Sequence, residues 1–413
     1  MQMLMKYKLT INNIMYQLVL LLAFFINFST AAASIAVGIG FLTIIYQIIK
    51  CKQFPTIDKE FIIIFAIYFV MQIIIALCSL DVLVSLREVI GEMHRCLPFF
   101  FAIMYIKEQY QLRNVLIVIL ISNIINDFTG IYQWFFLNIP RPYAFNHTAT
   151  FFGSFLLMQI PIHIFIAMLP IMPKWSRILA VFACVVSLFS LTISLTRGAW
   201  LAFIIVSIAF MLIDKIHRKM TLRLLSIILI CFVAASVFFP LIWRSVKTIT
   251  DPYYSSNTER VLMWKSSINI FKDYPVHGIG QKMFQRVYND EYILPNAIDK
   301  PGKDGQTGHS HPHSNIFKVL SEGGLIGIFA FTFLYGYFFH RFYIVYWREK
   351  NIMSLSAGLT AFLILLGLQI EGLTDTNMNQ VPIMREYWLL TGILLSPSIL
   401  TTYKAGEENE KRS

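Results

Sequence analysis

The sequence predicts an all-α polytopic membrane protein. Hydrophobic residues make up 57% of the chain and charged residues 14%, whereas soluble domains carry about 25% charged residues. The apolar residues gather in repeated runs close to the roughly 20 residues that a helix needs to cross a bilayer. One long polar stretch, about residues 243–314, interrupts this pattern late in the chain. We therefore expect a bundle of membrane helices with a single large loop.

Hydropathy predicts about twelve membrane spans. They cover residues 13–29, 32–49, 61–79, 88–106, 114–137, 149–170, 178–195, 199–213, 224–242, 316–339, 352–372 and 386–403. The fourth is the weakest, because four charged residues between 87 and 95 interrupt its start, and we expect a shorter span after an interfacial helix. The first run imitates a signal peptide, but the second run follows almost at once, which favours a helical hairpin.

Basic residues predict the orientation, because Lys and Arg accumulate in cytoplasmic loops. Nineteen of them fall in loops on the side of the N-terminus, against five on the other side: Arg87, Arg95, Arg141, Arg197 and Arg385. Both termini are thus expected in the cytoplasm, with the long loop outside. The expected organisation is membrane helices over 1–242, a loop subdomain over 243–314, membrane helices over 315–404 and a cytoplasmic tail over 405–413. The net charge of +11 then requires no nucleic-acid partner.

The long loop contains a predicted helix over about residues 258–272. Asn257 or Ser256 can cap its start, and Pro275 ends it. An apolar stripe at helical spacing consists of Val261, Trp264, Ile268 and Phe271. Residues 277–280 (HGIG) predict a turn, and residues 300–308, rich in turn formers, predict a mobile segment. We therefore expect the loop to fold over the membrane mouth as helices.

Ionisable side chains at the ends of membrane spans are costly and therefore candidates for function. Arg197 opens a predicted span after almost no loop, and its planar guanidinium suits phosphate oxygens; the alternative is an anchor that pairs with lipid head groups. Arg260 is a second phosphate candidate, with a solvated surface charge as its alternative. Four further residues near predicted outer span ends are candidates for lining the same mouth: Arg141, His147, Glu371 and Asp375.

Three histidines, His309, His311 and His313, alternate before the tenth span. On an extended strand they would share a face, which raises a metal site, but no HExxH motif or Cys/Asp cluster completes a ligand set. His313 differs because Pro312 restricts the backbone before it and Ser314 or Asn315 can cap the following helix. Imidazole exchanges a proton near neutral pH. His313 is therefore the candidate general base, with a capping or structural role as the alternative.

Three motifs, in this order along the chain, resemble the bacterial O-antigen ligase family, which shares a superfamily with O-antigen polymerases and some protein oligosaccharyltransferases. The first is TRGAW at residues 196–200, and the second is Arg260-x3-Trp264 leading to YPVHGIG at 274–280. The third is His313-Ser314 followed by Gly324 and Gly327, which is the most specific. The motifs cover about residues 180–335, and the number of spans resembles the family over the whole chain.

The resemblance implies a GT-C-like membrane glycosyltransferase that needs no metal or cofactor. Its reaction moves a polysaccharide from undecaprenyl diphosphate onto a sugar hydroxyl of lipid A–core, at the periplasmic face of the bacterial inner membrane, in lipopolysaccharide assembly. By position, Arg197 and Arg260 would bind the diphosphate and His313 would take the proton of the acceptor hydroxyl. The two glycines would let the tenth span pack closely against a neighbour.

Further residues are expected to bind substrate: Arg141, His147 and His311. The two extra histidines before the motif leave open which imidazole lies closest to the acceptor. The main alternative function is an O-antigen polymerase with the same donor, although one dominant loop favours the ligase. A polysaccharide flippase or other transporter would need charged residues at mid-span depth, whereas the unusual charges in this sequence collect at predicted outer ends.

Overall fold

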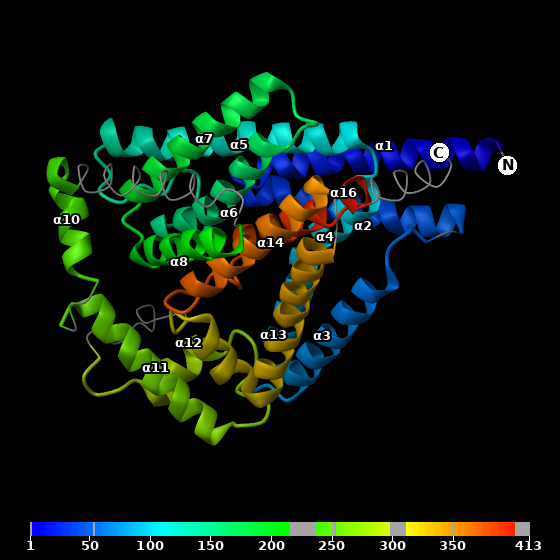
Figure 1. The fold of residues 1–413 in the computed structure, drawn as a ribbon. Coiled ribbons are helices and arrows are strands. Elements are labelled where there is room, and N and C mark those ends of the chain that lie inside the picture. Colours follow the sequence, from blue (N-terminus) through cyan, green and yellow to red (C-terminus); the bar gives the residue numbers. More distant parts are fainter. Residues whose placement is uncertain are drawn as a thin grey trace.

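The computed structural model describes residues 2–52, 54–214, 236–249, 251, 253–297, 311–348 and 351–400. Within these ranges every regular element is a helix and no strand occurs, which confirms the all-α class (Figure 1). The helices are α1 (Gln2–Phe25), α2 (Thr30–Cys51), α3 (Lys59–Leu77), α4 (Val82–Tyr105), α5 (Gln109–Phe135), α6 (Ala149–Met168), α7 (Lys174–Ile193), α8 (Arg197–Ile213), α10 (Pro240–Lys247), α11 (Ser255–Asp273), α12 (Phe284–Val287), η1 (Tyr288–Tyr292), α13 (Asn315–Arg348), α14 (Ile352–Glu371), α15 (Val381–Leu394) and α16 (Pro397–Leu400).

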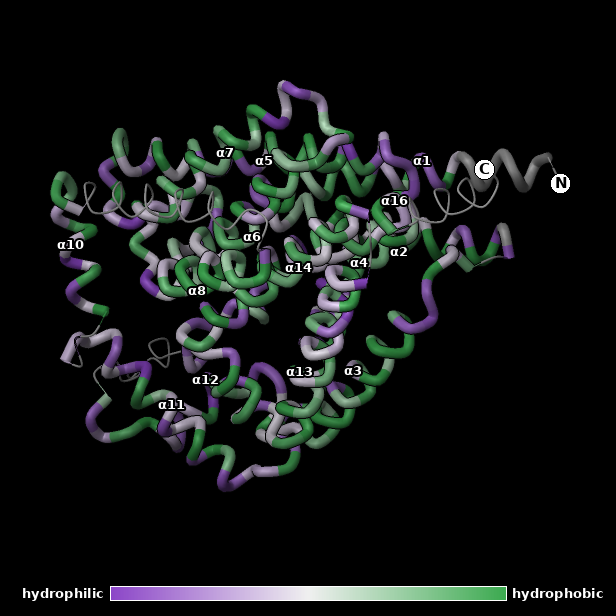
Figure 2. The backbone as a smooth tube through the Cα atoms, in the orientation of Figure 1, coloured by the Kyte–Doolittle hydropathy of each residue, from purple (hydrophilic) through white to green (hydrophobic). Residues whose placement is uncertain are grey.

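Seven of these helices are long and apolar enough to cross a membrane, namely α2, α3, α5, α6, α7, α13 and α14. Shorter apolar helices run over Thr10–Phe25 and Arg197–Ile213. Ten of the twelve predicted spans overlap a single helix each. The twelfth is divided between α15 and α16 and ends outside the described residues, and the ninth lies mostly outside them. Figure 2 shows α3 and α8 as predominantly hydrophobic along their length. The chain therefore has the character of an integral membrane protein, while the number twelve stays a prediction.

Aromatic packing forms the centre of one half of the bundle. The rings of Phe65 and Phe99, from α3 and α4, lie 5.0 Å and 6.0 Å from Trp388 of α15. Phe338 of α13 joins them at 5.1 Å from Trp388. α1 and α2 pack together, as the predicted hairpin requires, and α4 is one continuous helix without the interfacial break expected before it. α14 packs against α6, α8, α13 and α15. The loop that follows α14 is therefore held close to helices from the first and the last part of the chain.

The helix predicted over residues 258–272 is α11, and it contacts α13 (Figure 1). Two details of that prediction are wrong. Asn257 is not a cap but lies inside the helix, and its Nδ2 donates to the backbone oxygens of Thr248 and Asp251, both at 2.9 Å. Val261 and Ile268 are 43% and 38% exposed. The buried face is instead Leu262, Met263, Ser266, Ser267 and Ile270.

This face of α11 is buried, in place of the predicted one, because α11 packs on η1. The Ser266 hydroxyl donates to the Tyr292 oxygen at 2.6 Å, and Met263 and Ile270 join a core cluster with Phe284 of α12. Two small serines thus allow the close approach, although their polarity hides this face from a hydropathy pattern. The segment predicted to be mobile, residues 300–308, lies outside the described residues, as does His309.

α13 is broken at Gly324, where the backbone adopts φ 58° and ψ −150°. The turn at residues 275–280 fills the break: the N–H groups of residues 279 and 280 donate to the oxygens of residues 321 and 322 at 3.0 and 2.9 Å. In return, the N–H groups of residues 325 and 326 donate to the oxygens of residues 275 and 276 at 2.9 and 3.0 Å. Gly324 therefore serves this break, not helix packing as expected. An added Cβ at Gly324 would lie 2.7 Å from the Val276 oxygen of that turn, whereas one at Gly327 would lie 3.1 Å from the Val319 oxygen of α13 itself.

Candidate active site

His313 lies in a short turn that α11 and α13 hold from both sides. The Trp264 indole nitrogen donates to the Pro312 oxygen at 2.9 Å, and the Trp264 ring stacks on Phe317 at 5.1 Å. His313 itself has φ 48°, a left-handed conformation that few residues other than glycine adopt. α13 begins directly after Ser314, whose oxygen accepts the N–H of Lys318 at 3.0 Å. The backbone on both sides of the imidazole is thus fixed by packing and hydrogen bonds.

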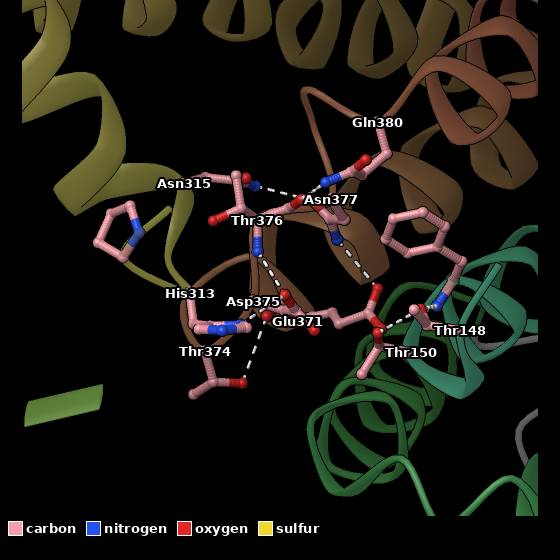
Figure 3. A network of polar contacts seen from close by, with 12 residues as sticks. Thr148, Thr150, His313, Asn315, Glu371, Thr374, Asp375, Thr376, Asn377 and Gln380 are labelled. Carbon is pink, nitrogen blue, oxygen red and sulfur yellow. Dashed lines mark hydrogen bonds and ion pairs between the residues drawn. The ribbon is translucent and has the colours of Figure 1, made fainter. Parts of the chain in front are cut away.

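Asp375 is the carboxylate next to His313 (Figure 3). Its Oδ1 lies 3.4 Å from His313 Nδ1 and accepts the Thr376 N–H at 2.7 Å. Burial alone would raise the pKa of Asp375, but the hydrogen bond and charge of His313, the charge of Arg260 and the Thr376 N–H lower it below its ordinary value. An ionised carboxylate at Nδ1 leaves Nε2 as the nitrogen available to accept a proton. The His313 side chain is 30% exposed and therefore accessible.

His311 contacts His313 edge to face, with ring centroids 4.5 Å apart. Burial, followed by the charge of His313, lowers the pKa of His311 to about 4, against the opposing charge of Asp375. His311 is therefore neutral at ordinary pH. Its Nδ1 has no hydrogen-bond partner among the described residues. The structure thus brings two of the three predicted histidines together, and only His313 has a carboxylate hydrogen-bonded to a ring nitrogen.

A buried polar network fixes the loop that carries Asp375 (Figure 3). Glu371, the last residue of α14, accepts the Ser154 hydroxyl at 2.6 Å and Asn377 Nδ2 at 2.9 Å on the same oxygen, Oε2. Asn315 donates to Asn377 Oδ1 at 2.8 Å through its side chain and to the Gly372 oxygen at 2.7 Å through its backbone. α6, α13, α14 and the 372–380 loop are therefore joined beside His313. Glu371, a sequence candidate, takes part in this positioning.

Arg197 is the first residue of α8. Its Nη1 donates to the Thr248 oxygen at 2.8 Å and to the Thr248 hydroxyl at 3.1 Å, and its guanidinium lies over the Tyr254 ring at 4.8 Å. The next residue, Gly198, lies against the Asp375 loop, because an added Cβ would come 2.8 Å from Thr374 Oγ1. The TRGAW motif therefore places a guanidinium beside the loop that holds the carboxylate of the histidine pair.

Arg141 and Arg260 complete a basic cluster with Arg197. Arg260 and Arg141 both exert like-charge repulsion on Arg197, and the charges of Arg260 and Asp375 both act on Arg141. Arg260 is partly exposed and makes no hydrogen bond or ion pair with the described part of the chain. The mutual repulsion of these three arginines, with Asp375 as the one carboxylate acting on them, raises the electrostatic free energy of the site. Binding of an anion would relieve this repulsion. The arrangement suits a multiply charged anion such as a diphosphate.

No interaction with a described residue places His147 in this cluster. It is exposed, directly before Thr148, which caps α6 by accepting the Phe151 N–H at 3.2 Å. It forms no hydrogen bond, ion pair or ring contact with any described residue, so its expected role in substrate binding stays a prediction. Among the same residues no group of three or more His, Cys, Asp and Glu side chains could hold a metal ion. Metal independence also stays a prediction.

Comparison with known proteins places all three sequence motifs in one family domain. Residues 182–332 match the family model described as O-antigen ligase. A putative polysaccharide ligase of Rickettsia felis is 23% identical over 72% of this chain and 67% of its own length. The O-antigen ligase of Salmonella typhimurium is 25% identical over 51% of this chain and 50% of its own length. The chain thus spans about half the length of the Salmonella protein.

The fold is a helical membrane bundle, and its candidate site combines a histidine–carboxylate pair with three arginines. Together with the match to proteins named as ligases, this indicates a glycosyl-transferring membrane enzyme. More narrowly, residues 182–332 match the O-antigen ligase family, and the two relatives named above are ligases by name. The resemblance indicated by the motifs at 196–200, 260–280 and 313–327 is thereby confirmed. Asp375 and Tyr254, which lie 62 residues from His313 and 57 residues from Arg197 in the chain, carry no motif that could have paired them with those residues in advance.

Proposed function

We propose that this protein is an O-antigen ligase of the bacterial inner membrane. It transfers a polysaccharide from undecaprenyl diphosphate onto a sugar hydroxyl of lipid A–core at the periplasmic face, as a step of lipopolysaccharide assembly. The observation that carries the proposal is the His313–Asp375 pair beside Arg141, Arg197 and Arg260. One base and several cations are the groups that a transfer from a lipid diphosphate requires.

In the proposed reaction, His313 Nε2 accepts the proton of the acceptor hydroxyl as its oxygen attacks the anomeric carbon of the donor. The bond between that carbon and the diphosphate oxygen breaks, and the electron pair leaves with undecaprenyl diphosphate. Asp375 stabilises the imidazolium at Nδ1 while the proton resides on the ring. The ring later releases this proton to solvent. Atoms and charge balance without a metal, nucleotide or redox partner.

The arginines act on the leaving group. Breaking the glycosyl–diphosphate bond adds a negative charge to the diphosphate, and the basic cluster stabilises this charge more than it stabilises the bound donor. Arg197 is held on Tyr254 and Thr248 before substrate binds, so little reorganisation accompanies the reaction. The undecaprenyl chain is apolar and would enter sideways from the bilayer between helices, which suits a site at helix ends.

The test is reconstitution of the purified chain in lipid nanodiscs with an undecaprenyl-diphosphate-linked glycan and lipid A–core. We expect glycan-capped lipid A–core, and the same rate with a chelator of divalent metals. In cells, deletion should leave undecaprenyl-linked polymer accumulated and lipid A–core uncapped. Extension of the donor glycan without capping would identify a polymerase instead, the alternative with the same donor. Loss of transfer on chelation would revive a metal site.

A further inference from the structure

A second polar site adjoins the candidate active site and has no role in the proposed reaction. It is a cavity of about 80 Å³, space for several water molecules. Asn315 belongs to both sites, because it lines the cavity and donates to Asn377 in the network beside His313. The polar residues that line the cavity include Glu88, Glu92, Gln281, Lys318, Glu322 and Asn379. We call this the acidic cavity.

Three carboxylates from α4 and α13 dominate the acidic cavity. Glu88 pairs with Arg95 at 2.7 Å, and Glu322 pairs with Lys318. Glu92 accepts the Tyr68 hydroxyl at 2.5 Å and has no ion-pair partner in the described part of the chain. The charge of Lys318 acts on both Glu92 and His311. Of the three carboxylates, Glu92 is therefore the one that pairs with no cation among the described residues.

A buried amide in the same cavity lacks a partner. Gln281 is 8% exposed; its Nε2 donates to the oxygen and Oε1 of Gln72 at 3.0 and 2.8 Å, while its own Oε1 has no hydrogen-bond partner among the described residues. Burying an acceptor without a donor costs free energy. Glu88 also lies 3.8 Å from the exposed Lys282, which places one end of the cavity near the surface. A ligand that brings hydroxyl donors would complete this site.

The charges of the two sites point to different parts of the substrates. The basic cluster attracts the diphosphate of the donor, whereas carboxylates and amide oxygens repel phosphate and accept hydrogen bonds from hydroxyl groups. An acceptor whose proton passes to His313 must approach from a side that the diphosphate does not occupy. We propose that the acidic cavity binds a neutral, hydroxyl-rich part of the acceptor glycan and so selects the acceptor. This inference rests on the proposed function.

The experiment compares Michaelis constants for the two substrates. Glu92→Gln keeps the shape of the side chain and an acceptor for the Tyr68 hydroxyl but replaces the carboxyl group by an amide. We expect it to raise the KM for lipid A–core about tenfold, as for a lost hydrogen bond to a charged group, and to leave the KM for the lipid-linked donor within twofold. Asn379→Ala, at a less buried position of the same cavity, should act in the same direction. Glu60→Gln, at the far end of α3 with a 48% exposed side chain, is the matched control.

An unchanged KM for lipid A–core in both cavity variants, with wild-type melting temperatures, would overturn the inference. An equal rise in the donor KM would do so too, because the cavity would then serve the donor. If Glu92→Gln does not fold, Asn379→Ala decides. If the wild-type chain extends a second lipid-linked glycan instead of capping lipid A–core, the proposed function fails by itself. The same comparison made with that glycan as the varied acceptor then tests the cavity.

Discussion

Among the described residues, His313 is linked to a carboxylate directly and His163 is linked to one through a serine, and their surroundings differ. His313, in the turn before α13, is 3.4 Å from Asp375 and 30% exposed. His163, inside α6, is fully buried; its Nδ1 lies 3.3 Å from the Ser187 hydroxyl, which donates to Asp127 at 2.5 Å. Both arrangements contain the residue types of an acid–base site. Only the first lies beside a cluster of arginines and within reach of a substrate.

The buried arrangement is closed on itself. His163 Nε2 lies 3.2 Å from Asn123 Nδ2, and Asn27 donates to Asn123 Oδ1 at 2.9 Å. If the asparagine donates to Nε2, the histidine donates from Nδ1 to Ser187, and the hydrogen bonds run in one direction to Asp127. α5, α6, α7 and the turn after α1 are thereby joined in the interior. The expectation that unusual charges collect only at outer span ends is therefore wrong, because Asp127 and His163 are buried within the bundle.

Residue types alone therefore do not identify the active site of this protein. A polar group inside a membrane bundle needs hydrogen bonds in any case, so a network in which both ring nitrogens have partners is sufficient explanation for His163. The His313 site is instead partly exposed and lies beside arginines whose charges act on one another and on Asp375. Mutations should therefore reduce the rate at His313 and stability at His163.

The largest expected effect is at His313. His313→Ala should reduce the transfer rate roughly 10²–10⁴-fold, since a general base contributes about that factor. The matched control is His311→Ala, 4.5 Å away between ring centroids, which should cost much less. Rates are measured in nanodiscs at saturating donor and acceptor. A dead His311→Ala enzyme together with turnover by His313→Ala would exchange the two assignments.

The basic cluster should give the next effect. Arg197→Ala and Arg260→Ala should each lower the rate about 10²–10³-fold, by analogy with the roughly 3 kcal/mol lost with an oxyanion donor. Lysine should restore activity only in part, because it lacks the planar fork that binds phosphate oxygens and stacks on Tyr254. Binding of undecaprenyl diphosphate, measured directly, should weaken in parallel. Full activity of either alanine variant at normal expression would remove that arginine from the mechanism.

Asp375 tests whether the carboxylate makes His313 different from an isolated histidine. Asp375→Asn should lower the rate about tenfold, as for an interaction of about 1.4 kcal/mol, because the imidazolium formed during the reaction loses its counter-ion. The lowered pKa of Asp375 means that its stabilising effect is complete above about pH 4 and is lost only as pH falls through the lower folded value. Melting temperatures between pH 5 and 8 should therefore show no step from this group. A wild-type rate in Asp375→Asn would contradict the pairing.

These expectations separate what the sequence could predict from what required the structure. Apolar runs located the helices, and local motifs picked out Arg197, Arg260 and His313. Contacts between distant segments were out of reach: Asp375 beside His313, Tyr254 under Arg197, and the turn at 275–280 that fills the break at Gly324. The predicted apolar stripe on α11 was wrong for a related reason. Two serines of α11 face its packing partner, whereas a hydropathy pattern treats serines as surface residues.

The smallest effect on the rate is expected at His163. His163→Leu fills a similar volume but leaves Asn123 and Ser187 without their shared partner, which should destabilise the fold by about 1–3 kcal/mol. The transfer rate per folded molecule should stay within about twofold of the wild-type rate, because no group that touches substrate in the proposed mechanism changes. Thermal unfolding in detergent gives the first quantity, and activity normalised to the folded fraction gives the second. A large loss of normalised activity without loss of stability would mean that the buried network takes part in the reaction, and the distinction between the two histidines would have to be abandoned.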